Sequence, residues 1–137
     1  NSDRDGGLGT GASIVASGLS AGIHIITASV SDSGGLAASD TIAISVNSAP
    51  SASINSPANG SVVSRATSVT FTGTAIDAED GDISANLTWV GSKDGPLGTG
   101  ASITVMLQGR GNQKITATAT DSRGLQASDS ISIRMSK

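Results

Sequence analysis

An internal repeat constrains this chain more than any other feature. Residues 5–14 read DGGLGTGASI and residues 94–103 read DGPLGTGASI. The correspondence continues without a gap at a constant offset of 89 residues, the distance from Asp5 to Asp94. It includes ITA at 26–28 and 115–117 and ASD at 38–40 and 127–129. An offset of this length is too long for a solenoid repeat and is typical of small domains in tandem.

The repeat divides the chain unequally. Residues 52–90 have no counterpart upstream, so residues 1–46 match only the second half of the later copy. We therefore expect an incomplete module over residues 1–47 and a complete module over residues 48–137. The short linker NSAPS at 47–51 contains a proline, which stiffens the junction.

Composition excludes several classes of protein. The 137 residues contain no cysteine, so neither a disulfide nor a thiolate site is available. The formal net charge is −3 and the few basic residues are scattered along the sequence, which argues against a nucleic-acid partner. No apolar run approaches the length of a membrane span, so we expect no membrane insertion.

Period-two alternation predicts strands throughout. Ile115, Ala117 and Ala119 alternate with threonines, and similar alternation recurs near 26–30, 42–46 and 131–135. For the complete module we expect about seven strands, near 52–55, 61–63, 68–76, 86–90, 102–107, 114–120 and 129–135. Short strands separated by Gly-, Asp- and Ser-rich turns predict an all-β fold, an antiparallel β-sandwich.

Four sequence blocks carry a family resemblance. They are AxDxEDGD at 75–82, LTW at 87–89, DGxLGTGAS at 94–102 and ITAxxxDSxGL at 115–125. In this order they resemble the tandem immunoglobulin-like (PKD-like) modules of large secreted or surface bacterial proteins. The resemblance covers all of the second copy and the retained half of the first. It implies an immunoglobulin-like sandwich, an extracellular or cell-surface location, and neighbouring modules of the same kind as partners.

The acidic residues form one candidate site. Asp77, Glu79, Asp80 and Asp82 fall in one loop, and Asp121 begins a turn that an immunoglobulin-type sandwich places at the same end. Converging carboxylates provide the oxygen ligands that calcium prefers, so we predict a calcium site here and no other cofactor. The alternative is that these are ordinary solvated turn residues.

No arrangement in the sequence favours catalysis. His24 is the only histidine, and its repeat counterpart is Gln113, so we expect it to be exposed and dispensable. The second copy cannot build a Ser-His-carboxylate group, and there is no cysteine nucleophile or metal-binding histidine cluster. The glycines at 9 and 11 are not followed by a helix pattern, which argues against a phosphate loop. We therefore expect a protein that is not an enzyme.

The chain's two aromatic residues are expected in the core. Trp89 takes the place at which such sandwiches bury a tryptophan, and we expect it to pack against Phe71, Ile115 and Ala117. A buried Trp89 would leave no aromatic platform for sugar stacking.

The incomplete copy lacks the strands that should cover it. Its apolar positions are Ile14, Ile26, Ala28, Val30, Ile42 and Ile44. A half-sandwich with both faces in water cannot offset its ordering entropy. We expect either a second copy of the chain, in a strand-swapped homodimer, or strands outside these residues to cover it.

The expected function is that of a non-catalytic spacer or adhesion module in a multidomain bacterial protein. The alternative is an accessory substrate- or carbohydrate-binding module of a secreted polysaccharide hydrolase or peptidase, with a polysaccharide or cell-surface ligand.

Overall fold

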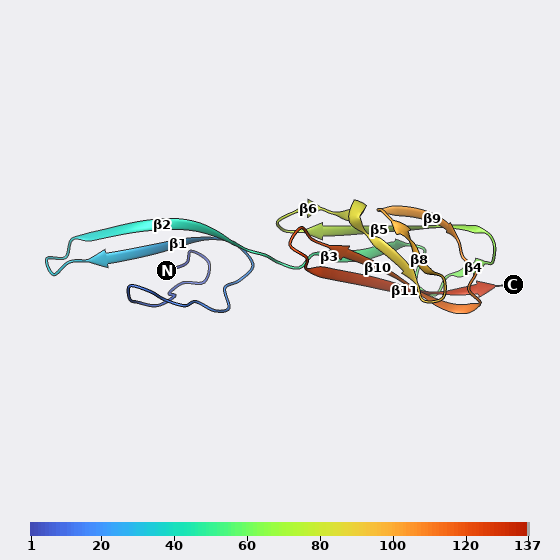
Figure 1. Ribbon diagram of the computed structural model, residues 1–137, viewed down its shortest axis with the longest axis horizontal. Helices are drawn as coiled ribbons and strands as arrows, with labels where there is room; N and C mark the ends of the chain where they lie inside the picture. Colours follow the sequence, from blue (N-terminus) through green and yellow to red (C-terminus); the bar gives the residue numbers. More distant parts are fainter. Residues whose placement is uncertain (137) are drawn as a thin grey trace. The chain divides into compact units, whose positions relative to one another are not determined.

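The computed structural model describes residues 1–136, which belong to two compact units, Asn1–Ser48 (unit 1) and Ala49–Lys137 (unit 2). The division falls within the predicted linker. Strands and one 3₁₀ turn make up the regular structure (Figure 1). Within the described residues no helix is long and apolar enough to cross a membrane.

Unit 1 is a β-hairpin with an N-terminal segment folded against it. Strand β1 (Gly22–Ser31) pairs antiparallel with β2 (Ala37–Val46). Ser2 forms isolated bridges with Gly6 and with Ile26. In unit 2 the equivalent pairs are Gly91 with Gly95 and Gly91 with Ile115. The sequence repeat is therefore also a repeat of strand register.

Unit 2 is a sandwich of two β-sheets. The first sheet contains, in order, β4 (Val62–Ser64), β11 (Gln126–Ser136), β10 (Gly111–Thr120), β7 (Thr88–Gly91) and β8 (Gly95–Thr99). The second contains β3 (Ser51–Ser56), β5 (Ser68–Asp77) and β6 (Gly81–Asp82), with β9 (Ser102–Met106) also paired to β5. Pairing is antiparallel except between β4 and β11. A single 3₁₀ turn, η1 (Ser84–Asn86), precedes β7.

The core lies between these sheets and confirms the predicted place of Trp89. Trp89 and Phe71 are buried, with ring centroids 5.9 Å apart and an interplanar angle of 39°. The indole Nε1–H donates to the Gly100 carbonyl at 2.8 Å, which satisfies its polar edge. Ile115 and Ala117 are fully buried, and Ala117 pairs directly with Trp89 across β10 and β7.

The all-β prediction is confirmed, and the seven predicted strands are present with shifts of a few residues at their ends. Two strands were not predicted. Residues 95–99, which the glycines indicate only as a turn, form β8, whose register shifts between Trp89 and Val90 of β7. The two-residue β6 pairs with the end of β5.

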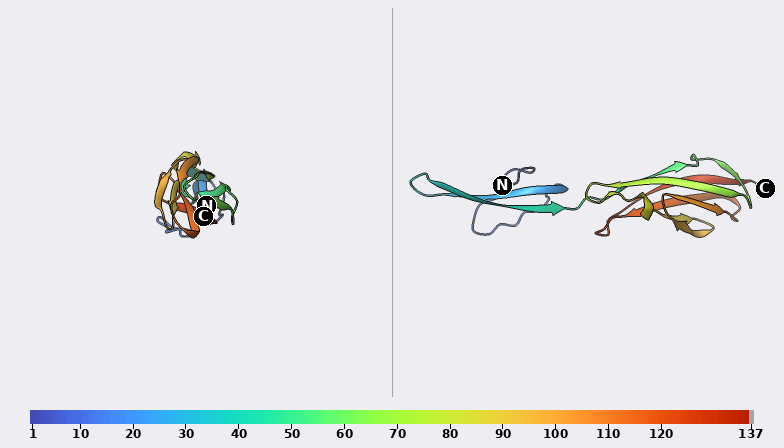
Figure 2. Two further views of the ribbon diagram at one scale, coloured as in Figure 1. Left: turned by 90° about the vertical axis from the view of Figure 1, so that its right-hand side faces the viewer. Right: turned by 90° about the horizontal axis from the view of Figure 1, so that it is seen from above.

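The two ends of the unit 2 sandwich carry different strands and turns. Figures 1 and 2 place β6 and the turn between β10 and β11 at the end where β3 begins, and the end of β11 at the opposite end. We call these the β6 end and the β4 end.

Candidate functional sites

The prediction that His24 is exposed is wrong, because its side chain is completely buried in unit 1. Its Nε2–H donates to the Ser20 carbonyl at 2.6 Å. In the neutral ring Nδ1 then accepts from the Ser2 hydroxyl, 2.9 Å away. Asp5 and Ser20 close a loop formed by residues 5–20. The Oδ2 and Oδ1 atoms of Asp5 accept from the backbone N–H and the hydroxyl of Ser20, each at 2.8 Å.

Unit 2 closes the equivalent loop, residues 94–109, with different side chains. The buried Gln113 replaces His24 and donates from Nε2 to Asp94 Oδ2 at 2.8 Å. Its Oε1 accepts from the backbone N–H groups of Lys93 and Asp94, both at 3.1 Å. Asp94 Oδ1 accepts from the N–H of Gly109 at 3.0 Å, as Asp5 accepts from Ser20 at the equivalent position.

The Ser2, His24 and Asp5 cluster does not have the geometry of a catalytic triad. A triad uses both ring nitrogens, one toward the nucleophile and one toward the carboxylate. Here Ser2 and Asp5 both lie on the Nδ1 side, with Asp5 Oδ2 at 3.6 Å, while a carbonyl occupies Nε2. Ser2 is itself only 2% exposed. The cluster holds the N-terminal segment against β1.

The acidic loop and the 121–125 turn meet at the β6 end, as the sequence predicts. Asp80 joins them, because its Oδ2 and Oδ1 accept from the backbone N–H and the hydroxyl of Ser122 at 2.7 and 2.8 Å. Asp77 is 3% exposed, and its Oδ1 accepts from the N–H groups of Glu79 and Asp80 at 2.9 and 2.8 Å. Asp77 Oδ2 is buried and has no hydrogen-bond partner.

Of the three remaining predicted ligands, Glu79 takes part through its backbone N–H, which donates to Asp77. The side chains of Asp82 and Asp121 hold local backbone in place. Asp82 Oδ1 accepts from the N–H and the hydroxyl of Ser84 at 2.9 and 2.5 Å. Both hydrogen bonds stabilise the ionised form, so the Ser84 hydroxyl and N–H hold the pKa of Asp82 below its usual value. Asp121 Oδ1 accepts from the N–H groups of Arg123 and Leu125, both at 2.8 Å.

The five carboxylates fit a calcium ion only in part. Asp77 keeps a buried oxygen without a partner, whereas both oxygens of Asp80 and one of Asp82 are already engaged. Among the described residues, no group of three or more His, Cys, Asp or Glu side chains is placed to hold a metal ion.

Unit 1 exposes an apolar sheet face that unit 2 buries. Val30 is 68% exposed and Ile42 is 61% exposed, while their counterparts Ala119 and Ile131 are 0% and 7% exposed. In unit 2 the second sheet supplies the cover, including Phe71. Shallow hollows lined by Ala28, Val30, Ala38 and Ile42 lie on the open face of β1 and β2.

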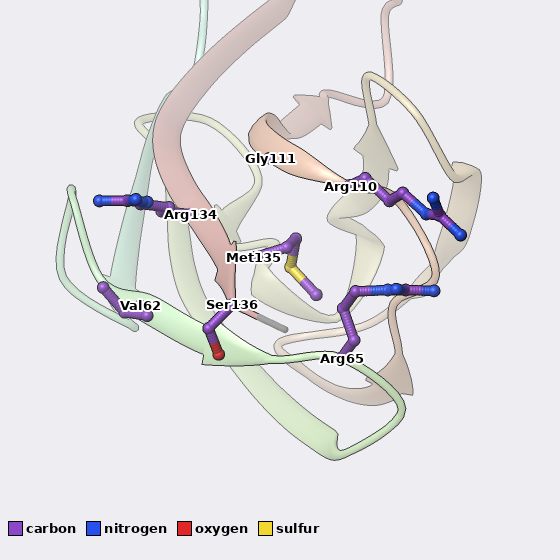
Figure 3. Close-up of a pocket in the computed structure, with 7 residues that line it drawn as sticks. All are labelled: Val62, Arg65, Arg110, Gly111, Arg134, Met135 and Ser136. Carbon is purple, nitrogen blue, oxygen red and sulfur yellow. The ribbon is translucent and has the colours of Figure 1, made fainter.

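A basic pocket at the β4 end was missed from the sequence. Its volume is about 530 Å³, and Figure 3 shows its lining, which is Val62, Arg65, Arg110, Gly111, Arg134, Met135 and Ser136. Lys93 adjoins it, since its Nζ donates to the Arg110 carbonyl. The basic residues come from four separate segments of the sequence, which is why the sequence alone shows them as scattered.

No family model, no curated protein and no solved structure matches this chain.

Proposed function

We propose that this chain is a non-catalytic spacer or adhesion region of a secreted or cell-surface protein, built from tandem immunoglobulin-like (PKD-like) modules. The proposal is carried by what the two copies share. Asp5 and Asp94 close the same loop through backbone N–H groups. Asp32 and Asp121 each accept from the N–H groups two and four residues further on. The duplicated residues thus specify the scaffold.

The course of the chain through unit 2 supports a mechanical role. The chain enters unit 2 at the β6 end and β11 ends at the β4 end, so the start of β3 and the end of β11 are separated by the length of the sandwich (Figure 1). Its buried core of aromatic and aliphatic side chains and its paired sheets make it a compact spacer. Modules linked in this way hold a functional domain away from its anchor.

The alternative, an accessory carbohydrate-binding module, finds less support. Sugar-binding platforms use exposed aromatic rings, whose apolar faces cover a sugar ring. The chain's only aromatic residues, Trp89 and Phe71, are 1% and 0% exposed. The spacer function is therefore the better supported of the two.

Calcium belongs to the proposal as a stabiliser of the β6 end, supported by the buried Asp77 Oδ2. Asp77, Glu79, Asp80, Asp82 and Asp121 remain the candidate ligands. The ion would bind carboxylate oxygens and link the acidic loop to the 121–125 turn.

Force spectroscopy tests the spacer function. The chain is held by handles at its two ends and stretched. We expect unit 2 to unfold in one discrete event, lengthening the chain by about 300 Å for its roughly 90 residues at full extension. Gradual extension at low force, without a discrete event, would contradict a load-bearing role. Binding to neutral polysaccharides at micromolar concentration would favour the alternative.

A further inference from the structure

Three arginines, Arg65, Arg110 and Arg134, line the basic pocket at the β4 end. Within residues 1–136, no carboxylate pairs with Arg65, Arg110 or Arg134. Asp94 is the acidic residue at this end, and hydrogen bonds to Gln113 and to the Gly109 N–H occupy its two oxygens. Arg65 Nε is buried and has no hydrogen-bond partner. Among the described residues, the pocket therefore keeps one buried donor without a partner and positive charge that no carboxylate pairs with.

The fold of the hairpin does not require these arginines. At the repeat offset, Ala21 takes the place of Arg110 and Ser45 takes the place of Arg134. Strands β1 and β2 nevertheless form in the same register as β10 and β11. The arginines are thus a property of unit 2 that its sibling lacks, which points to a binding role.

We propose that this pocket binds an oxyanion, a sulfate or carboxylate group carried by an acidic polysaccharide. Figure 3 shows Arg65 and Arg110 extending toward the same side, with Met135 between the arginines at the centre of the pocket. Guanidinium groups offer planar pairs of donors that match the oxygens of carboxylates and sulfates. An anion at Arg65 and Arg110 would neutralise two neighbouring like charges, which pair with no carboxylate of residues 1–136.

A polysaccharide fits this pocket better than a nucleic acid. Single-stranded nucleic acids are held by aromatic stacking as well as by phosphate contacts, and both aromatic residues of this chain are buried. The choice of a polysaccharide rests on the proposed extracellular setting, whereas the oxyanion site itself does not. An experiment can therefore contradict the extracellular spacer function without contradicting the oxyanion site, and the reverse.

Calorimetry with the full chain tests the proposal. The probes are heparin for sulfate groups, polygalacturonate for carboxylates, neutral dextran as a control, and a single-stranded oligonucleotide. The variant R65Q/R110Q removes two guanidinium groups from the pocket. R4Q/R123Q makes the same change in net charge at residues that do not line the pocket and is the matched control. Melting temperatures establish that both variants are folded.

We expect heparin or polygalacturonate to bind the wild type, and dextran not to bind. R65Q/R110Q should weaken this binding by about tenfold or more, because each lost charge-assisted hydrogen bond weakens binding substantially. R4Q/R123Q should change it by less than about twofold. Equal losses in both variants, or no binding of either acidic polymer, would overturn the site. Tighter binding of the oligonucleotide through the same arginines would keep the oxyanion site and overturn the polysaccharide.

Discussion

Gly91 and Gln113 fit closely against each other on neighbouring strands of unit 2. A Cβ atom added to Gly91 would lie 2.8 Å from Gln113 Oε1 and 3.5 Å from Ile115 Cδ1. Unit 1 has Ser2 and His24 at these positions, with the Ser2 hydroxyl 2.9 Å from His24 Nδ1. Each copy thus contains a matched pair, Gly with Gln or Ser with His, beside the aspartate that both copies have in the loop.

This matching predicts a coupled effect on stability. Gly91→Ser alone should destabilise unit 2 by about 1–3 kcal/mol, because the added atoms overpack against Gln113. Gln113→His alone removes the acceptor of the Lys93 and Asp94 N–H groups. The double variant rebuilds the Ser–His pair of unit 1. Its loss in free energy of unfolding should be smaller than the sum of the two single losses by at least about 0.5 kcal/mol. Urea unfolding followed by Trp89 fluorescence measures all three, and strictly additive losses would contradict the pairing.

Trp89 should contribute more to stability than any other single side chain of unit 2. Trp89→Ala removes a buried ring that contacts Phe71 and should cost about 3–5 kcal/mol. Trp89→Phe keeps much of the apolar volume and should cost less. Circular dichroism follows both variants, since they lack the only tryptophan. In the wild type we expect weak acrylamide quenching, and free quenching would place the indole at the surface.

Trp89 and His24 show what the sequence could and could not predict. Trp89 is a large apolar side chain on a predicted sandwich strand, and such side chains are usually buried between the sheets. Its burial could therefore be predicted from the sequence. The exchange of His24 for Gln113 suggested a free surface position. Both side chains are instead buried, because each forms hydrogen bonds inside a loop that an aspartate closes. His24 bonds to the Ser20 carbonyl, and Gln113 bonds to Asp94. A tolerated exchange between polar residues does not indicate exposure.

The strands and the charged sites show a similar contrast. Strands β10 and β11 follow from period-two alternation, whereas β8 contains glycines that indicate a turn. The meeting of Asp80 with Ser122 could be predicted, because the strand order of a sandwich places the two loops at one end. The basic pocket could not, because Arg65, Arg110 and Arg134 come to line one pocket only through the pairing of β4 with β11 and of β11 with β10.

Asp82 should make the β6 end sensitive to acid. Its pKa in the folded protein lies below the usual 3.8 because of the hydrogen bonds from Ser84. A depressed pKa contributes stability that is present above the unfolded-state value and is lost as pH falls through the folded-state value. Asp82→Asn should therefore lower the melting temperature at neutral pH, and its difference from wild type should shrink as pH falls from 6 to 2. A difference that stays constant over this range would contradict the role of the charge.

The calcium prediction is tested by the melting temperature in EDTA and in millimolar calcium. We expect calcium to raise it, because bound ions stabilise the folded state. Asp77→Asn keeps an oxygen for the N–H groups of Glu79 and Asp80 but removes the charge, so it should abolish the rise. Arg123→Gln, a change in the neighbouring turn that removes no carboxylate, is the control. An unchanged wild-type value would leave Asp77 and Asp80 with a loop-ordering role alone.

The open face of unit 1 should behave differently from the same face in unit 2. Ile131→Asp places a charge in the core and should unfold unit 2, since an unpaired buried carboxylate is strongly unfavourable. Ile42→Asp changes the equivalent position, which is 61% exposed, and should leave the monomer folded.

Light scattering then decides what covers this face. We expect the wild type to self-associate through β1 and β2, and Ile42→Asp to reduce this association, because exposed apolar faces and open sheet edges favour pairing. A monomeric wild type with protease-sensitive residues 1–46 would instead assign the cover to strands outside this chain. A monodisperse monomer with a protease-resistant unit 1 would show that the half-sandwich stands alone, and both expectations would then be wrong.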